Sequence, residues 1–287
     1  MILKTFNLPM ALSGGNLYPA VRRMLPQVAE RRIREAFDRR DVKMNGVRVK
    51  RDTPAIAGAE IKIYLSDEGL THSPEILYED ASLLVVNKPI GLSCEPDGKG
   101  GLTVGEWVYQ TSEGRLLQTP MPCHRLDNQT DGLLILAKNE QALRLMQQAF
   151  YRHQVHKCYQ CLVKGAPTPP SAVRTAYLLK DAERARVRVL DRPVPGALTI
   201  TTEYQVLESG ETSRLKVTLH TGRTHQIRAH MAYLGHPLLG DDQYGDRAWN
   251  REMRAKRLML CATELSFSVE GEFSYLNALS ITLPCPF

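Results

Sequence analysis

The run of residues 124–134 (His-Arg-Leu-Asp-Asn-Gln-Thr-Asp-Gly-Leu-Leu) constrains the fold of this chain more than any other stretch. It sets Asp127 close to Arg125 at the entrance to a strand-like apolar run, Gly132 to Leu136. A carboxylate at the end of a buried strand is costly unless another group pairs with it. We therefore expect the fold to bring partners for this acid from other parts of the chain.

Two later runs offer such partners. Residues 157–163 (Lys-Cys-Tyr-Gln-Cys-Leu-Val) place Tyr159 on an alternating, strand-like segment. Residues 222–230 (Gly-Arg-Thr-His-Gln-Ile-Arg-Ala-His) carry Arg223 and Arg228 into a helix. An acid, an aromatic ring and an arginine that arrive from three places suggest a site that holds a planar ring.

These runs resemble three motifs of the RluA-type pseudouridine synthases: H-R-L-D-x-x-T-x-G-L-L, K-x-Y-x-x-x-V-x-G and G-R-T-H-Q-I-R-x-H. Residues 240–245 (Gly-Asp-Asp-Gln-Tyr-Gly) and the opening at 76–89 (I-L-Y-E-D-x-x-L-L-V-V-N-K-P) are similar to the same family. The resemblance covers roughly residues 75–287, and motifs in the right order are far more specific than one alone. It implies a pseudouridine synthase fold with a mixed, largely antiparallel sheet, and it implies isomerisation of uridine in RNA.

The positive charge is concentrated in the first 70 residues. They hold 13 Lys and Arg against 8 Asp and Glu, a net charge of +5 out of +6 for the whole chain. A basic segment on a nearly neutral body favours a polyanionic partner, with RNA or DNA first. A solvated helix face would give the same charge count, so charge alone leaves both readings open.

The pattern of residues 17–51 separates these readings. An apolar stripe of Ala29, Ile33, Ala36 and Phe37 predicts a helix. Asn45-Gly46 predicts a two-residue hairpin turn between short strands, and a further strand follows at 60–65. Two short helices before such a hairpin resemble an S4-type RNA-binding domain, although Tyr18-Pro19-Ala20-Val21 replaces the usual L-D-x-x-L start. The expected RNA contacts in this domain are Arg31, Arg34, Arg39, Arg40, Lys43 and Arg48.

The 287 residues and 43% hydrophobic content fit one large domain and one small one. We expect an S4-like domain at 1–68, a linker at 69–74 and a catalytic domain at 75–287. Strands are expected at 83–87, 133–136, 159–163, 199–206, 215–220 and 265–268, and helices at 103–109, 140–151 and 224–234. Strands with a few interspersed helices indicate an α+β domain rather than a doubly wound one.

The chemistry implied by the resemblance breaks the N1–C1′ bond of uridine, turns the base and rejoins it through C5. No redox step or external group enters, so no cofactor is expected. The resemblance makes Asp127 the essential residue, attacking either C6 or C1′, and Arg228 its partner. It places Tyr159 on the uracil face, either stacking alone or also helping to remove the C5 proton. Arg125 fills the gap left by the flipped nucleotide, and Arg223 is a second RNA contact of this domain.

Other classes of site are disfavoured by spacing. The histidines at 220, 225, 230 and 236 are separated by five, five and six residues, which does not place them on one helix face. Cys158 and Cys161 form a lone C-x-x-C whose thiols leave a strand on opposite faces, so no metal site is expected. The chain carries no P-loop, G-x-S-x-G or G-x-G-x-x-G motif. No apolar run of membrane-spanning length and no signal peptide are evident, so we expect a monomer in the reducing cytoplasm.

The RNA target stays open at this point. An S4-like domain on an RluA-type enzyme favours large-subunit ribosomal RNA, and transfer RNA is the alternative. A second alternative is a non-catalytic RNA-binding or ribosome-assembly factor on the same scaffold. Asp127, Tyr159 and Arg228 together argue against it, because a binder does not need all three. The related synthases of the 16S type usually carry G-R-L-D and K-x-H-Q-V-R-R, which differ from the motifs here.

Overall fold

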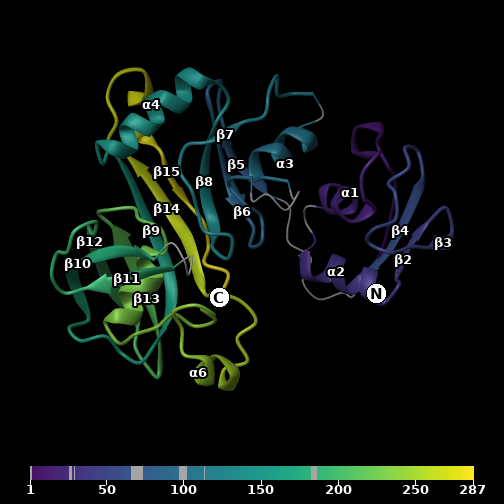
Figure 1. The fold of residues 1–287 in the computed structure, drawn as a ribbon. Helices are drawn as coiled ribbons and strands as arrows, with labels where there is room; N and C mark the ends of the chain where they lie inside the picture. The colour runs from purple at the N-terminus through teal and green to yellow at the C-terminus, as the bar shows by residue number, and fades with distance from the viewer. Residues whose placement is uncertain are drawn as a thin grey trace. The chain divides into compact units, whose positions relative to one another are not determined.

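The computed structural model describes residues 2–25, 28, 30–65, 74–96, 102–112, 114–181 and 186–287. The chain forms two compact units (Figure 1): Met1–Glu75 with Lys88–Pro122, and Ile76–Asn87 with Cys123–Phe287. The expected linker at 69–74 falls almost entirely outside the described residues. Residues 88–122 group with the N-terminal part, so these units do not coincide with the expected domains, and the domain organisation stays a prediction.

The N-terminal part of the first unit is a small sheet with two helices. The strand order is β1-β4-β2-β3, with β1 at Ile2–Asn7, β2 at Val42–Met44, β3 at Val47–Arg48 and β4 at Glu60–Leu65. The helices are η1 at Met10–Leu12, α1 at Leu17–Met24 and α2 at Glu30–Asp38. Buried Val21, Ile33 and Phe37 pack against Ile61 and Ile63 of β4.

The predicted hairpin is confirmed. Asn45 and Gly46 both have positive φ angles, 49° and 81°, as a tight turn between twisted strands requires. The strand predicted at 60–65 is also present as β4. The sequence reading missed β1, which pairs antiparallel with β4 along its whole length.

Residues 88–122 contribute α3 at Val104–Thr111 and β7 at Met121–Pro122. Thr103 and Glu106 cap the start of α3, each side chain accepting a hydrogen bond from the other residue's backbone N–H. The buried Lys88 donates to the carbonyls of Pro89 and Leu92 at 3.0 Å. These contacts fix the start of the helix predicted at 103–109.

The second unit is built on a long mixed sheet. Its strand order is β11-β10-β12-β13-β9-β14-β8-β6-β5, and β15 pairs with β14. The bounds are β5 Glu75–Glu79, β6 Leu83–Lys88, β8 Asp131–Ala137, β9 Val155–Lys164, β10 Ser171–Asp181, β11 Arg186–Leu190, β12 Leu198–Glu208, β13 Thr212–Leu219, β14 Leu260–Phe267 and β15 Ser280–Thr282. The pairs from β11 to β14 are antiparallel, and β14 runs parallel to β8. The expected α+β fold with a largely antiparallel sheet is therefore confirmed.

Four helical segments accompany this sheet: α4 at Glu140–Tyr151, α5 at Gln226–Tyr233, α6 at Arg247–Glu252 and the 3₁₀ segment η2 at Gly271–Ala278. In Figure 1, β9 and β14 run side by side as long central strands, and α4 contacts β8. Helix α5 packs on β11 and β12. All predicted strands and helices of this unit are present, whereas β5, β10, β11, β15, α6 and η2 were not predicted.

The sheet register brings two of the predicted motifs together. Tyr159 on β9 lies opposite Ala262 on β14, and Ala262 lies opposite Gly132 on β8. Gly132 has a φ of 112°, and a Cβ atom there would lie 2.2 Å from the carbonyl oxygen of Ala262. Glycine is therefore required where β8 begins, a few residues after Asp127.

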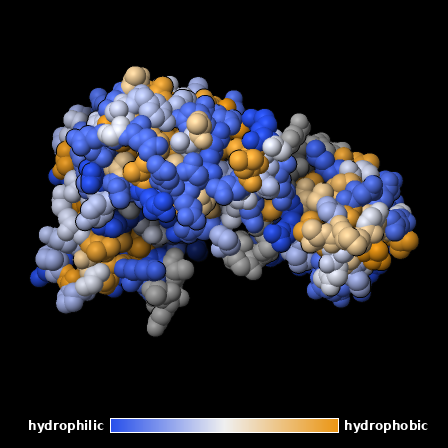
Figure 2. All heavy atoms as spheres, turned by 90° about the horizontal axis from the view of Figure 1, so that it is seen from above, coloured by the Kyte–Doolittle hydropathy of each residue, from blue (hydrophilic) through white to orange (hydrophobic). Residues whose placement is uncertain are grey.

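Polar side chains cover most of the face shown in Figure 2, and apolar ones form small separate groups there. Among the residues that the structure describes, no helix is long and apolar enough to cross a bilayer. Apolar groups of this size are ordinary on a protein surface.

We predict that Gly132→Ala destabilises the protein strongly. The substitution adds backbone strain at a positive φ and a clash with Ala262, which together cost roughly 2–6 kcal/mol. Gly235→Ala is the matched control, since its φ is 88° but no atom lies within 4 Å of the added Cβ. Urea denaturation of both variants measures the difference. Equal losses in the two proteins would show that the approach of β8 to β14 is not tight.

Candidate active site

Two cavities of the second unit meet at Asp127. We call one the aromatic cavity, because it contains Tyr159 and Phe150, and the other the arginine cavity, because it contains Arg186 and Arg247. Their volumes are about 520 and 650 Å³. Both lie in the range of small-molecule sites. They share Asp127, His225 and Arg228.

The aromatic cavity gathers the residues predicted for catalysis. Asp127, Tyr159 and Arg228 all line it. Tyr159 is 5% exposed on β9, and its position opposite Ala262 places it two strands away from the strand that follows Asp127. Acid, aromatic ring and arginine thus meet at one cavity, as the sequence motifs predicted.

The predicted contact between Asp127 and Arg228 is present but secondary. Nη1 of Arg228 donates to Oδ2 of Asp127 at 3.4 Å. The shorter pair is with Asp241, which accepts from Nε at 2.7 Å and from Nη2 at 2.9 Å. Both members of this bidentate pair are buried, Arg228 at 4% and Asp241 at 0% exposed. Sequence reasoning quoted the Gly-Asp-Asp-Gln-Tyr-Gly run and did not assign this role to Asp241.

The backbone around Asp241 completes the ion pair. Its Oδ1 also accepts hydrogen bonds from the backbone N–H groups of Gln243 and Tyr244, at 2.8 and 2.9 Å. Burial alone raises the pKa of Asp241, but Arg228 and these N–H groups outweigh it, so the pKa of Asp241 is lowered. Burial opposes the charge of Arg228 as well, yet Asp241 and Asp127 raise the pKa of Arg228. The guanidinium is thus a fixed cation with one nitrogen turned to Asp127.

His225 is a second neighbour of Asp127. It adopts a left-handed conformation, with φ 55°, just before α5. Its Nε2 lies 3.7 Å from Oδ2 of Asp127, and its Nδ1 lies 2.9 Å from the hydroxyl of Tyr244. The helix predicted from residue 224 begins at Gln226 because His225 leaves the helical region.

Nδ1 of His225 is paired with a hydroxyl group that also accepts a backbone hydrogen bond. The hydroxyl oxygen of Tyr244 accepts from the backbone N–H of Val187 at 2.9 Å, so its proton is available for Nδ1 of His225. Burial and the nearby Arg228 lower the pKa of His225, against the opposing charge of Asp127, and the ring is neutral at neutral pH. With the hydroxyl of Tyr244 donating to Nδ1, the single ring proton is on Nε2, the nitrogen that faces Asp127.

Cations surround the mouth of the aromatic cavity. Arg125 and Arg223 are exposed and line it, as predicted for RNA contacts. Lys157 lies on the same face of β9 as Tyr159, with Nζ 5.0 Å from the centre of the Phe150 ring. Burial lowers the pKa of Lys157 to about 8. The spacing Lys-x-Tyr on a strand could have identified Lys157 as a cavity residue, because positions two apart share a face.

The basic residues predicted in the S4-like region lie in the other unit. Arg34 is exposed and pairs with Glu30 at 3.2 Å, and Arg39 and Arg40 are exposed. Lys43 and Arg48 face each other across the β2–β3 hairpin. The side chain of Arg31 lies outside the described residues. These cations belong to the first unit, and the two cavities belong to the second.

Comparison with known proteins places this geometry in a family. The sequence model of the RNA pseudouridylate synthase family matches residues 82–233. The ribosomal large subunit pseudouridine synthase C of Vibrio parahaemolyticus is 31% identical, with 93% of this chain and 90% of that protein covered. The Vibrio cholerae protein of the same name is 37% identical over 67% of this chain, which spans 60% of that protein.

A solved structure agrees with these matches. Human RNA pseudouridylate synthase domain containing 1 has a TM-score of 0.61 and 27% identity, over 75% of this chain and 84% of that one. The chain belongs to the RNA pseudouridylate synthase family. The predicted family, fold class and enzyme class are confirmed, whereas the S4-like assignment of residues 1–68 and the roles of the site residues stay predictions.

We predict that Asp241→Asn lowers the free energy of unfolding by about 3–5 kcal/mol, because it leaves a buried guanidinium without its main counter-charge. Asp242→Asn is the matched control. The carboxylate of Asp242 is adjacent in the sequence, but it is 70% exposed and lies 3.8 Å from Arg228. The control should cost less than about 1 kcal/mol. Chemical denaturation compares the two variants. A small loss for Asp241→Asn would mean that the buried pair does not hold Arg228.

We predict that RNA affinity falls as the pH rises from about 7 to about 9. The pKa of Lys157 is lowered to about 8 in the unbound protein, and a nearby phosphate would favour the ammonium form. Binding then takes up a proton in this range. His124 and His225 have lowered pKa values and are neutral throughout it. Lys157→Met should bind more weakly at pH 7 and lose this pH dependence, which filter binding at constant ionic strength measures. If the RNA affinity of Lys157→Met depended on pH as that of the wild type does, Lys157 would not be the group that takes up the proton.

Proposed function

We propose that this enzyme isomerises specific uridines in large-subunit ribosomal RNA to pseudouridine, with Asp127 as its essential catalytic residue. The observation that carries the proposal is the carboxylate of Asp127, which faces the Tyr159 cavity beside Arg228 and His225. The printed names of the Vibrio relatives, ribosomal large subunit pseudouridine synthase C, support ribosomal RNA as the substrate. Transfer RNA is the alternative substrate.

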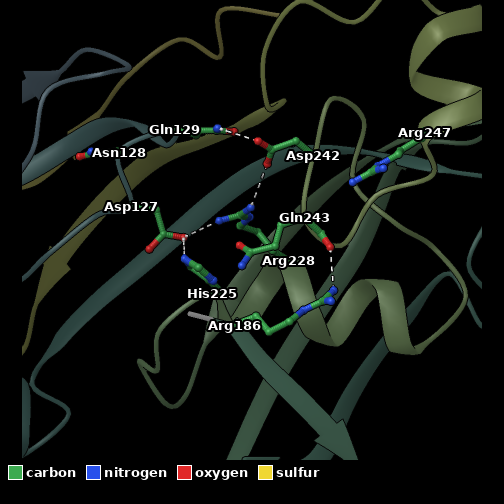
Figure 3. A pocket seen from close by; sticks show the side chains of 9 residues that line it. All are labelled: Asp127, Asn128, Gln129, Arg186, His225, Arg228, Asp242, Gln243 and Arg247. Atoms are coloured by element: carbon green, nitrogen blue, oxygen red, sulfur yellow. Dashed lines mark hydrogen bonds and ion pairs between the residues drawn. The ribbon is translucent and has the colours of Figure 1, made fainter. Parts of the chain in front are cut away.

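One oxygen of Asp127 is available for chemistry in this proposal. The contacts from Arg228 and His225 both reach Oδ2, as Figure 3 shows. Within the described part of the chain, Oδ1 makes no hydrogen bond or ion pair. A carboxylate oxygen held in this way can attack a sugar or base carbon, and attack at C1′ and at C6 of the target uridine both begin from it.

Tyr159 and the surrounding cations complete the proposed mechanism. The phenol ring stacks on the uracil while the glycosidic bond is broken and the base turns, either alone or with its hydroxyl also helping to remove the C5 proton. Arg125 fills the space that the flipped uridine vacates, and Arg223 and Lys157 contact phosphates. Base flipping costs a few kcal/mol of stacking, which such contacts offset.

The N-terminal sheet and helices act as an S4-like RNA-binding region in this proposal. Lys43 and Arg48 are directly opposite on a hairpin, where two like charges destabilise the pair. An anionic partner removes this repulsion, which supports an RNA contact at β2–β3. The six free cysteines support a reducing compartment, and we propose the cytoplasm and a monomeric enzyme.

We predict that Asp127→Asn abolishes tritium release from 5-tritiated uridine in large-subunit ribosomal RNA, while RNA affinity stays within a few-fold of wild type. The amide keeps the shape of the side chain and removes its charge. Asp191→Asn, an exposed acid outside both cavities, is the control and should be fully active. Transfer RNA labelled in the same way tests the alternative substrate. Near wild-type release by Asp127→Asn would refute the catalytic role of Asp127.

A further inference from the structure

We propose that the arginine cavity binds the nucleotide adjacent to the target uridine, with the phosphate on Arg247 and the base against the amide of Gln129. This inference rests on the proposed function, since it assumes that the uridine occupies the aromatic cavity. It adds a second RNA subsite that shares Asp127, His225 and Arg228 with the aromatic cavity and whose other lining residues have no part in the proposed mechanism.

The position of the arginine cavity supports this reading. Asp127, His225 and Arg228 line both cavities. The arginine cavity therefore lies directly beside the cavity assigned to the reacting base. The target uridine is covalently joined to a neighbour on each side. A strand whose uridine enters one cavity must therefore pass close to the other. The arginine cavity, at about 650 Å³, is no smaller than the one assigned to the uridine.

The cations of this cavity divide into two kinds. Arg186 donates to the carbonyl of Gln243 at 2.9 Å and lies over the Tyr244 ring, and Arg228 is held by Asp241. Arg247 is exposed at the start of α6 and forms no ion pair with any described residue. Figure 3 shows its guanidinium directed into the cavity. Arg247 is therefore the cation available to an incoming phosphate, and its planar fork suits that group.

The opposite wall offers groups that recognise a base. Asn128 and Gln129 come from the loop that follows Asp127, so they are placed by the same turn as the catalytic acid. Nε2 of Gln129 donates to Asp242 at 3.3 Å, as Figure 3 also shows. This bond uses one N–H of the amide, and among the described residues the amide oxygen of Gln129 is available as an acceptor for a ligand. Side-chain amides are common readers of base edges in splayed RNA.

The test asks whether Arg247 contacts one particular phosphate beside the target uridine. The probe is the ribosomal RNA hairpin that the wild-type protein binds most tightly, made with a neutral methylphosphonate on either side of its target uridine. Arg247→Ala should weaken binding of the unmodified hairpin by at least roughly tenfold. It should also reduce the salt slope of the affinity by about 0.7, the value for one phosphate contact on a single strand. One of the two methylphosphonates should weaken wild-type binding and leave Arg247→Ala unaffected.

The control is Arg251→Ala, which removes an exposed arginine from the same helix without touching the cavity. It should leave affinity, salt slope and methylphosphonate effects at wild-type values. Equal effects of both arginine variants, or undiminished sensitivity of Arg247→Ala to both methylphosphonates, would overturn the subsite. Tritium release by the wild-type protein is measured in parallel. If Arg247→Ala loses its sensitivity to one methylphosphonate but the wild-type protein releases no tritium, only the proposed function is contradicted. If the wild-type protein releases tritium but Arg247→Ala keeps its sensitivity to both methylphosphonates, only the subsite is contradicted.

Discussion

The buried pair of Arg228 and Asp241 is the interaction on which the candidate site depends. Removing two charges from water costs several kcal/mol for each ion, and only close geometry with further hydrogen bonds offsets this cost. Here the guanidinium fork meets both carboxylate oxygens, and two backbone N–H groups complete the shell of Asp241. Without this pair, Arg228 would have no fixed direction from which to reach Asp127.

The loop at 240–245 is shaped around this acid. A Cβ atom on Gly245 would lie 2.2 Å from the carbonyl oxygen of Asp241, so the chain closes on itself more tightly than any other residue allows. The same closure brings the hydroxyl of Tyr244 to Nδ1 of His225, whose Nε2 lies 3.7 Å from Asp127. The run Gly-Asp-Asp-Gln-Tyr-Gly thus positions both neighbours of Asp127, Arg228 and His225.

The electrostatics of the two cavities suit an RNA strand that must be bound and also opened. Arg125, Lys157 and Arg223 surround an aromatic cavity whose acid is Asp127. In the arginine cavity, two cations are occupied by protein groups, and Arg247 remains for a ligand. Positive charge therefore lies around the two cavities, while the negative charge of Asp127 lies where they meet.

The sequence by itself determined the family, the sheet-rich fold and the meeting of Asp127, Tyr159 and Arg228. Helix 140–151 and the Asn45-Gly46 hairpin were predicted correctly because apolar periodicity and turn chemistry are local properties. Strand β10 was missed because its apolar residues do not alternate regularly, and β11 because its alternating run is only five residues long. Pairing between the two strands supplies their order.

Only the tertiary structure decided which acid holds Arg228. Asp241 and Asp242 are adjacent and chemically identical in the sequence, yet one side chain is 0% and the other 70% exposed. The fold of the loop makes this choice, and it depends on contacts with a helix more than ten residues away. The arginine cavity likewise joins the loop after Asp127, the start of β11 and the start of α6. No local pattern links these segments, because long-range packing alone brings them together.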